Sequence, residues 1–398
     1  MIGGGAAGFF SAINLAIRHP NYHISILEKN DKVLSKVRIS GGGRCNVTNH
    51  CLDNKALVKN YPRGQKELLQ VFARFSVQDT LQWFPKHGVP LKTEDDGRVF
   101  PASNSSESII NCFLTLASQK NINIMTKCEV HAVKNHEQFQ VKTSKGNFDA
   151  DIIIVASGGY HKSAGYDWLK NMGHNIDSPI PSLFTFNLPN ADIKKQLQGI
   201  SVNLAKVSAM ESKQGYEGPV LITHWGLSGP AVLKLSAFAA HDFFRTNYTD
   251  NIYVNWIHPN KAIDAESTLL LTQKLKHKAL AVNHPEYQLP KRLWEFLCAE
   301  AAIEDTKRWA EIPVKKIRKL AQLLTRSEYH MEGKTTFKEE FVTCGGINLK
   351  EIDFKTMQSK LIPNLYFCGE VLNIDGITGG FNFQAAWSAA WVCANAIP

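Results

Sequence analysis

The first residues of the chain carry a glycine pattern suited to binding phosphate. Residues 3–8 read Gly-Gly-Gly-Ala-Ala-Gly and fit G-x-G-x-x-G. A helical pattern follows, and the alternating segment 23–28 ends on Glu28, twenty residues after Gly8. Glycines at these places let backbone N–H groups approach a pyrophosphate at a helix N-terminus, and an acid at this spacing accepts from ribose hydroxyls. The pattern predicts a dinucleotide-binding βαβ unit whose cofactor contacts are Gly3, Gly5, Ala6, Ala7, Gly8, Glu28 and Lys29.

The strand that should lead into this loop is shorter than expected. Such a strand needs about five residues, and only Met1-Ile2 precede Gly3. We therefore expect the sequence to begin inside the strand. A protein that starts at Met1 is expected to bind dinucleotide poorly and to be unstable.

A second glycine loop follows at residues 40–46, which read Ser-Gly-Gly-Gly-Arg-Cys-Asn. Three consecutive glycines give a permissive backbone that can pass close to a flat or phosphorylated ligand. A flexible surface loop is the alternative. Because a basic residue, a thiol and an amide follow directly, the ligand-binding interpretation is favoured. The predicted cofactor contacts here are Arg38, Ser40, Gly41, Gly42 and Arg44.

Two later segments resemble the ends of parallel strands that bind ligands. Residues 151–156 form an apolar run closed by Ser157-Gly158-Gly159, and residues 365–370 form a strand that ends in Gly-Glu. In α/β sheets, ligands bind at such strand ends. Further glycines then lead into the small-residue helix 385–396, and the N-terminus of a helix stabilises developing negative charge.

Length and composition set the elements that must position these motifs. The chain has 398 residues, 44% apolar and 20% charged, which is ordinary globular composition and indicates two to three domains. No apolar run reaches the roughly 18 residues of a membrane helix. The eight Cys show no C-x-x-C pair, so we expect a cytoplasmic protein with reduced thiols and without a metal site.

The middle of the chain differs in texture from both ends. Residues 200–258 alternate in short runs typical of a β-rich domain, and they contain His224 in a Thr-His-Trp-Gly segment. An ordinary helix start at Ser228 and Pro230 explains this segment at least as well as a catalytic role for His224 does. Residues 261–326 are helical and hold thirteen Lys and Arg against eight Asp and Glu. A solvated helix face or a phosphate-binding patch would both explain that balance.

Only one G-x-G-x-x-G is present, so a second nicotinamide-binding fold is not expected. The tightly held cofactor is therefore predicted to be FAD, with NADH or NADPH visiting transiently. The chain resembles the BaiN/RdsA-type NAD(P)/FAD-dependent oxidoreductases, also known as YhiN-like flavoproteins. The matching segments are GGGAAG (3–8), Glu28, SGGGRCNVTN (40–49), GRVFP (97–101), ASGG (156–159), THWGLSGPA (223–231), TCGGIN (343–348) and LYFCGEVLNIDGITGGFNFQAAW (365–387).

The resemblance implies an α/β fold, in which a glutathione-reductase-like FAD domain is split by an inserted β-rich domain and a helical cap. The implied boundaries are 1–185 with 342–398 for the FAD domain, 186–260 with 327–341 for the β-rich domain, and 261–326 for the basic cap. The implied cofactor contacts also include Val130, Ala156, Ser157 and Gly158 near the ADP half, Gly369 and Glu370 at the ribitol, and Gly379, Gly380, Phe381 and Asn382 at the isoalloxazine.

The family also implies the chemistry. One branch reduces a uridine of 23S ribosomal RNA to dihydrouridine, and another reduces ring C=C bonds of bile-acid intermediates. Both add a hydride from reduced flavin and a proton to an activated double bond. Cys45 is the first candidate proton donor, with Arg44 expected to bias it toward thiolate. Simple packing of Cys45 against the flavin is equally compatible with the sequence, and His224 is the second candidate.

The basic balance of the chain, formally +9, favours RNA over a small enone. Residues 261–326 are expected to contact the ribosomal RNA, with a steep weakening of binding by salt. A small-molecule ene-reductase or dehydrogenase is the alternative. A non-redox RNA-binding protein with structural FAD is the third possibility, and no membrane or metal partner is expected.

Overall fold

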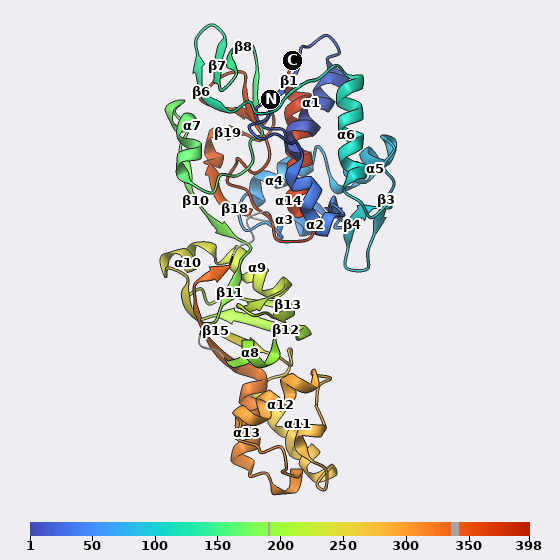
Figure 1. Cartoon of the computed structure of the whole chain (residues 1–398), viewed down its shortest axis with the longest axis vertical. Helices are drawn as coiled ribbons and strands as arrows, with labels where there is room; N and C mark the ends of the chain where they lie inside the picture. The colour runs from blue at the N-terminus through green and yellow to red at the C-terminus, as the bar shows by residue number, and fades with distance from the viewer. Residues whose placement is uncertain (190–191, 336–341) are drawn as a thin grey trace. The chain divides into compact units, whose positions relative to one another are not determined.

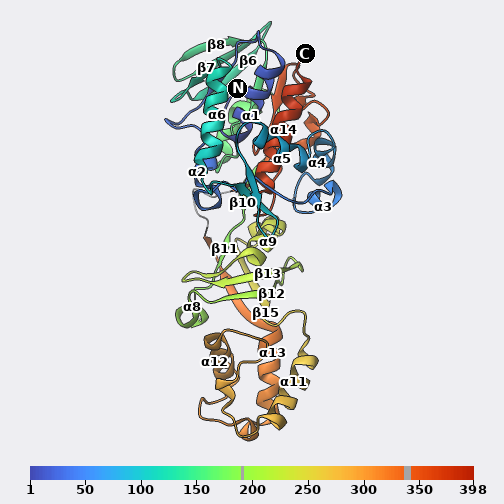
Figure 2. The same ribbon diagram turned by 90° about the vertical axis from the view of Figure 1, so that its right-hand side faces the viewer.

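The computed structural model describes residues 1–189, 192–335 and 342–398. They form two compact units, and each is described by itself (Figures 1 and 2). Unit 1 comprises Met1–Ser182 and Lys338–Pro398, and unit 2 comprises Leu183–Phe337. Residues 336–341, part of the predicted β-rich segment 327–341, lie outside the described residues.

The centre of unit 1 is a mainly parallel sheet. Its order is β5 (Asn123–Met125), β1 (Ser25–Leu27), Ile2, β9 (Ile153–Val155), β21 (Leu365–Phe367), β20 (Gln358–Ser359) and β19 (Ile352–Asp353). Ile2 pairs in parallel with Leu27 on one side and Val155 on the other. The segment before the glycine loop thus lies in the middle of the sheet, where a βαβ unit requires it.

Helices and small antiparallel sheets surround this sheet, and the α/β class of the predicted fold is confirmed. The helical segments are α1 (Ala6–Arg18), α2 (Ser35–Gly43), α3 (Asn54–Val58), α4 (Gln65–Phe72), α5 (Val77–Lys86), α6 (Glu107–Gln119), η1 (Ser163–Tyr166), α7 (Asp167–Asn171), η4 (Leu349–Glu351) and α14 (Phe381–Ala396). The remaining strands are β2 (Thr48–Asn49), β3 (Leu91–Thr93) and β4 (Arg98–Pro101), then β6 (Val130–Asn135), β7 (Phe139–Thr143) and β8 (Gly146–Ala150), and the antiparallel pair β10 (Ile176–Ser182) and β18 (Val342–Ile347).

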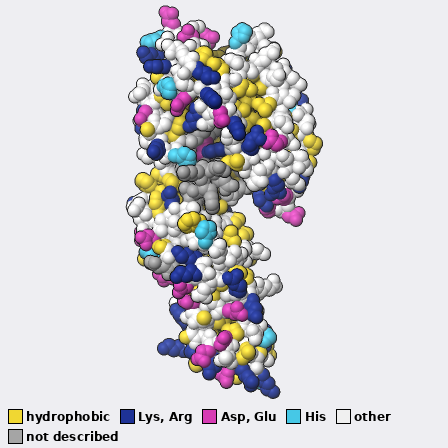
Figure 3. Space-filling view, in the orientation of Figure 1, with side chains coloured by type: hydrophobic (Ala, Val, Ile, Leu, Met, Phe, Trp, Pro, Cys, Tyr) yellow, Lys and Arg dark blue, Asp and Glu magenta, His cyan; other side chains and the backbone are white. Residues whose placement is uncertain are grey.

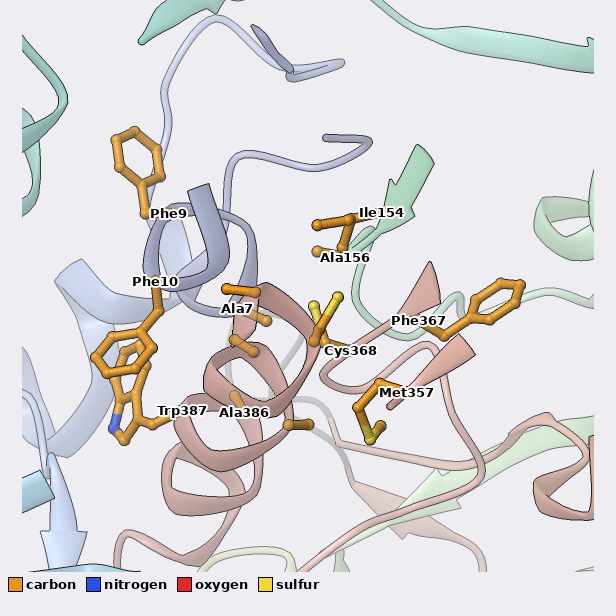
Figure 4. Close-up of a cluster of buried hydrophobic side chains, with 14 of the residues drawn as sticks. Ala7, Phe9, Phe10, Ile154, Ala156, Met357, Phe367, Cys368, Ala386 and Trp387 are labelled. Atoms are coloured by element: carbon orange, nitrogen blue, oxygen red, sulfur yellow. The ribbon is translucent and has the colours of Figure 1, made fainter. Parts of the chain in front are cut away.

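The core of unit 1 lies where the two ends of the chain meet. Helix α1 packs against α14, and the ring centroids of Phe10 and Trp387 are 5.3 Å apart (Figure 4). Both side chains are fully buried. Aromatic pairs of this kind contribute beyond the area they bury, so the first and last helices hold each other in place beneath the glycine loop.

Unit 2 is built on an antiparallel sheet. Its strands in order are β16 (Ser327–Glu332), β15 (Thr249–Asn255), β12 (Ser201–Ala209), β13 (Gly215–Ile222), β14 (Gly226–Ser228), β11 (Thr185–Asn187) and β17 (Lys334–Thr335). The alternation of buried and exposed residues along β12, β13 and β16 shows that one face of the sheet packs inward and the other faces water.

The helices of unit 2 share one buried core with this sheet. They are α8 (Asp192–Leu197), α9 (Pro230–Phe238), α10 (Ala240–Arg245), α11 (Ala262–Leu275), η2 (Ala281–Asn283), α12 (Lys291–Glu300), η3 (Trp309–Glu311) and α13 (Val314–Arg326). Helix α13 lies between α11 and α12 and continues directly into β16 (Figure 2). The basic segment 261–326 is therefore joined to the sheet both by the chain and by packing.

Candidate active site

The glycines of the loop at residues 3–8 have two different roles: Gly3 and Gly8 are closely packed, whereas Gly5 borders open space that a ligand can enter. A Cβ atom at Gly8 would lie 2.0 Å from the carbonyl oxygen of Gly3, and one at Gly3 would lie 2.4 Å from that of Ala156. A Cβ atom at Gly5 would have no described atom within 4 Å. Gly5 caps the N-terminus of α1, and no side chain of the described residues caps this end. The loop thus leaves open space at its middle glycine, where the dipole and the N–H groups of the helix favour an anion.

Glu28 follows β1 and is fixed beside this loop. Its Oε2 accepts from the backbone N–H of Gly4 at 2.8 Å, and its Oε1 accepts from the backbone and side-chain nitrogens of Asn30, both at 2.9 Å. The residue is 9% exposed. Lys29 points elsewhere, with its Nζ 5.4 Å from the ring centroid of Tyr160. The carboxylate that the sequence assigned to a ribose is therefore held in one orientation next to the phosphate-binding loop.

The segment after β9 reaches the same loop. The backbone N–H of Ala156 donates to the carbonyl of Ile2 at 2.8 Å, and the methyl group of Ala156 lies 3.6 Å from a Cβ built at Gly8. Ser157 and the left-handed Gly158 (φ +74°) follow. Val130 instead begins β6 and pairs with Thr143 in a separate three-stranded sheet.

The C-terminal loop after β21 meets the first turn of α1. A Cβ at Gly369 would lie 2.9 Å from that of Ala7. Glu370 accepts from the backbone N–H of Thr343 at 3.0 Å and pairs with Lys36 at 2.6 Å. The fully buried hydroxyl of Thr343 has no hydrogen-bond partner among the described residues. Glu370 therefore ties together the start of α2, the strand β18 and the end of β21.

Two further side chains of this loop bind the strands β10 and β18. Asn373 accepts from the backbone N–H of Gly345 at 3.0 Å and donates to Asp177 at 2.7 Å. Asp375 forms a bidentate ion pair with Arg63, and the Ser182 hydroxyl donates to it at 2.7 Å. Together with Glu370, these contacts anchor the loop at three points along its length.

Sequence reasoning missed Arg63 and Asp375. Asp375 is completely buried, and burial raises the pKa of its carboxyl, an effect that Arg63 opposes. The only sequence signal was a second acid in the motif that begins with Glu370, placed between Ile374 and Gly376. Nothing in the sequence pairs it with an arginine 312 positions away.

The N-terminus of α14 closes the loop. Gly380 caps the helix at φ +94°, and a Cβ there would lie 2.4 Å from the backbone of Thr48. The Asn382 amide bonds both the N–H and the carbonyl of Gly376 at 2.8 Å. Tyr61 donates to the carbonyl of Phe381 at 2.7 Å, and the Phe381 ring is buried. Gly379 precedes the cap, and its carbonyl accepts from Asn49 at 3.3 Å.

The second glycine loop is a tight turn with an open side. Gly41, Gly42 and Gly43 all have left-handed backbone angles, which glycine adopts without strain. A Cβ at Gly41 would lie 3.0 Å from the Phe100 ring, whereas one at Gly42 would have no described atom within 4 Å. The Ser40 carbonyl accepts from the backbone N–H of Cys45 at 2.9 Å and closes the turn.

Cys45 is fully buried within this turn, and its thiol differs from the sequence-based expectation. Burial raises the pKa of the thiol to about 12 from its ordinary value of 9.0. Arg44 pairs with Glu94 at 2.7 Å and stacks 3.9 Å from the centroid of Phe100. The expected bias toward thiolate was therefore wrong, because desolvation dominates and Arg44 is engaged elsewhere. Arg38 likewise pairs with Glu107 on the surface.

His224 belongs to unit 2. It is exposed at the tip of the tight turn between β13 and β14, where the N–H of Thr223 donates to the carbonyl of Gly226 at 2.7 Å. Its ring lies 4.7 Å from that of Trp225, which is also exposed. The two candidate catalytic residues therefore occupy contrasting environments, one buried in unit 1 and one on the surface of unit 2.

The residues of unit 1 fit FAD. Open space at Gly5, the uncapped end of α1, the oriented carboxylate of Glu28 and the buried hydroxyl of Thr343 would meet a dinucleotide's phosphates and hydroxyls. No group of three or more His, Cys, Asp or Glu side chains suited to a metal occurs among residues 1–189, 192–335 and 342–398. Within the same ranges, every helix is too short or too polar to span a bilayer.

Comparisons with known proteins agree with this assignment. The family model described as "HI0933-like protein Rossmann domain" matches residues 1–396. A "Ribosomal RNA dihydrouridine synthase" from Escherichia coli is 29% identical over 411 residues, which cover 99% of this chain and 96% of that protein. A "3-dehydro-bile acid delta(4,6)-reductase" from Clostridium scindens is 26% identical over 423 residues, and this alignment covers 100% of this chain and 98% of that protein.

A solved structure shows the same fold. The 3-ketosteroid delta1-dehydrogenase from Sterolibacterium denitrificans superimposes with a TM-score of 0.52 at 9% identity, covering 99% of this chain and 98% of that one. At this identity the likeness concerns the architecture alone.

Proposed function

Because this chain belongs to the HI0933-like family of Rossmann-domain proteins, we propose that it reduces a uridine of 23S ribosomal RNA to dihydrouridine. The chain is a flavin-dependent oxidoreductase, as the sequence resemblance indicated. The observation that carries the RNA assignment is the alignment with the rRNA dihydrouridine synthase of E. coli, which extends over 99% of this chain. The alignment therefore includes both compact units.

Bound FAD would supply a hydride to the double bond, and NADH or NADPH is the proposed source of its electrons. The residues of this chain would bind and orient the cofactor. The loop at residues 3–8 would hold the pyrophosphate of FAD, and Glu28 would hold its adenosine ribose. Glu370, Asn373 and Asp375 fix the loop that leads to Gly379 and Gly380, which are proposed to lie against the ring system.

Cys45 is the proposed proton donor. A donor must be protonated before the reaction, and a thiol with a pKa of about 12 keeps its proton at neutral pH. Hydrogen bonding by the Ser40 side chain lowers the pKa of this thiol, but desolvation is the larger influence. The substitution Cys45→Ala is expected to leave reduction of the flavin by NADH intact while slowing its reoxidation by substrate. If both half-reactions of the variant keep the rates of the parent chain, Cys45 has a packing role and His224 becomes the next candidate.

The charge of unit 2 supports RNA over a bile-acid-like enone, the substrate class of the alternative function. The helical segment 261–326 contains five more basic than acidic residues. Figure 3 shows Lys and Arg side chains together with Asp and Glu side chains on this part of unit 2. A small enone would need an apolar pocket and gives no reason for this excess. Extruding a base from structured RNA costs a few kcal/mol, which phosphate contacts can offset.

The test is an anaerobic reaction of the full chain, loaded with FAD, with NADH or NADPH and a transcript of the ribosomal peptidyl-transferase region. Digestion and mass spectrometry would detect the gain of two hydrogens on a uridine. We expect dihydrouridine that depends on both the transcript and the nicotinamide. A flavin that NADH reduces but that leaves every uridine unchanged would contradict the RNA assignment, and turnover of a steroid enone in its place would establish the alternative. Oxidised flavin under both nicotinamides would contradict the proposed electron source.

A further inference from the structure

Three of the five cations of α13 lie in a line along one exposed face of the helix, together with Gln322. Lys315, Lys319, Gln322 and Arg326 are all exposed, and at 3.6 residues per turn they fall within about 60° around the helix. The opposite face, with Ile317, Leu320, Ala321 and Leu324, is buried in the core of unit 2. At 1.5 Å per residue the line is about 16 Å long, which is enough to meet several phosphates of a nucleic acid strand.

Two lysines of this line form no ion pair with the described residues. Lys315 and Lys319 make no ion pair or side-chain hydrogen bond with the described residues. Arg318 of the same helix, in contrast, pairs with Glu266 at 2.7 Å, and Lys276 at the end of α11 pairs with Glu286 at 2.9 Å. The charges of Lys315 and Lys319 are therefore not neutralised by a described carboxylate and are available to a polyanion.

The neighbouring side of α13 has a different character. Lys316 borders a hollow of about 700 Å³ whose lining includes Glu295, Glu304 and Asp305, and its Nζ donates to the carbonyl of Ala302. Three carboxylates around one lysine would repel a polyanion. The acidic hollow and the basic line therefore limit the direction from which RNA can approach this part of unit 2.

The line ends on an aromatic pair at the sheet. The guanidinium carbon of Arg326, the last residue of α13, lies 4.1 Å from the ring centroid of Tyr253 on β15. Arg326 is exposed and Tyr253 half-buried, so the outer plane of the pair faces water. A guanidinium stacked on an aromatic ring offers a flat surface on which an unpaired RNA base can stack.

We propose that the line formed by Lys315, Lys319 and Arg326, with Tyr253 at its end, is the surface that holds the RNA substrate. The inference rests on the proposed function. It replaces the expected RNA-contacting segment, residues 261–326, with one face of α13 and the stacked pair at its end. Lys315 and Lys319 would contact phosphates without regard to sequence. Arg326, which is stacked on Tyr253, would stack on an unpaired base of the RNA. This base would lie next to the RNA helix whose phosphates the two lysines contact.

The experiment measures binding of the FAD-loaded chain to a fluorescein-labelled transcript of the peptidyl-transferase region at several salt concentrations. In the double variant Lys315→Gln/Lys319→Gln, the slope of log K against log salt is expected to fall by about two, with a loss of about tenfold or more in affinity at low salt. The matched control is Lys274→Gln/Lys278→Gln, which removes two exposed cations from the end of α11 and the turn after it. The control is expected to keep both the slope and most of the affinity.

Arg326→Lys separates stacking from charge, because it keeps the cation and loses the planar group. We expect an unchanged salt slope, an affinity loss of about fivefold or more for single-stranded RNA, and little change for a duplex of the same length. Thermal melts of all variants should match that of the parent chain, since each change is on the surface.

The outcomes distinguish this surface from the function on which it rests. A parent chain that neither binds the transcript nor produces dihydrouridine would overturn both. If the parent chain produces dihydrouridine but the test and control double variants lose the same amount of salt slope, only the proposed RNA-binding surface is overturned. The loss of slope would then depend on total charge and not on the position of the lysines. Equal affinity losses for Arg326→Lys on single and double strands would remove the stacking role of Arg326 and Tyr253.

Discussion

The two units use charged side chains in opposite ways. In unit 1, the acids of the candidate site are largely withdrawn from water: Asp375 is fully buried, Glu28 nearly so, and Glu370 retains 19% of its side-chain exposure. Each accepts hydrogen bonds from fixed partners. In the helices of unit 2, an ion pair such as Lys291–Glu295 is exposed, and Lys315 has no acidic partner among the residues that the structure describes.

The difference separates two ways of binding. A buried charge is costly to leave without its partner, so its contacts specify geometry within a fraction of an ångström. Exposed charges are screened beyond about 8 Å at physiological salt and act through their number and placement. Substitutions in the site of unit 1 should therefore change stability and cofactor binding, whereas substitutions on α13 should change salt-dependent affinity while leaving the fold intact.

The largest expected effect comes from packing at the glycine loop of unit 1. In Gly8→Ala the new methyl group would lie 2.0 Å from the carbonyl oxygen of Gly3, a backbone atom that cannot move aside without disturbing the sheet. We expect little or no folded protein, as measured by soluble yield and near-UV circular dichroism.

Gly5→Ala is the matched control for Gly8→Ala. The same methyl group meets no described atom there, and the φ of −92° suits alanine. This variant should fold with nearly the parent stability and bind FAD more weakly, since the methyl would occupy the space left for the phosphates. A normal flavin content in Gly5→Ala would contradict the placement of the cofactor, and a stable Gly8→Ala would contradict the packing.

The next effect tests the buried ion pair. Asp375→Ala leaves the guanidinium of Arg63, whose side chain is only 13% exposed, without its carboxylate. Loss of one partner of a buried pair costs about 3–5 kcal/mol, to be measured by urea unfolding with FAD removed. The control is Arg318→Ala on the surface of unit 2, where loss of the pair with Glu266 should cost under about 1 kcal/mol. Similar losses in the two variants would break the contrast between the units.

Local spacing explains which parts of this site could be predicted from sequence. The loop at residues 3–8 and Glu28 are separated by one helix and one strand, so the 3.6-residue and two-residue periods place them together. The same holds for Glu370, which ends a strand pattern. The structure describes each of them at the expected place in its element.

Long-range pairing and burial explain what could not be predicted. Arg63 and Asp375 meet only because the chain leaves unit 1 after β10 and returns to it in β18, after residues 183–337, which no local pattern encodes. The pKa of Cys45 was mispredicted for a related reason: Arg44 is adjacent in sequence, but the environment of the thiol is set by how deeply the turn is buried. Charge neighbours can be read from a sequence, whereas desolvation requires the fold.

The smallest effect is the alkaline loss of stability caused by the Cys45 thiol. In the folded chain this thiol keeps its proton up to a pKa of about 12, whereas the unfolded thiol releases it near 9.0. Between these values the unfolded state binds fewer protons, so the free energy of unfolding falls as the pH rises above 9. At pH 10 this loss of stability is about 1.4 kcal/mol, since one pKa unit corresponds to 1.36 kcal/mol.

Other buried thiols, such as Cys298 and Cys344, titrate in the same direction, so the measurement must be a difference between the parent chain and a variant without this thiol. Urea unfolding of the parent chain and of Cys45→Ala at pH 8 and pH 10 isolates the term: the drop in stability should be about 1.4 kcal/mol smaller in the variant. Equal drops would mean that burial does not raise the pKa of this thiol, which would remove the argument that burial keeps the proposed donor protonated.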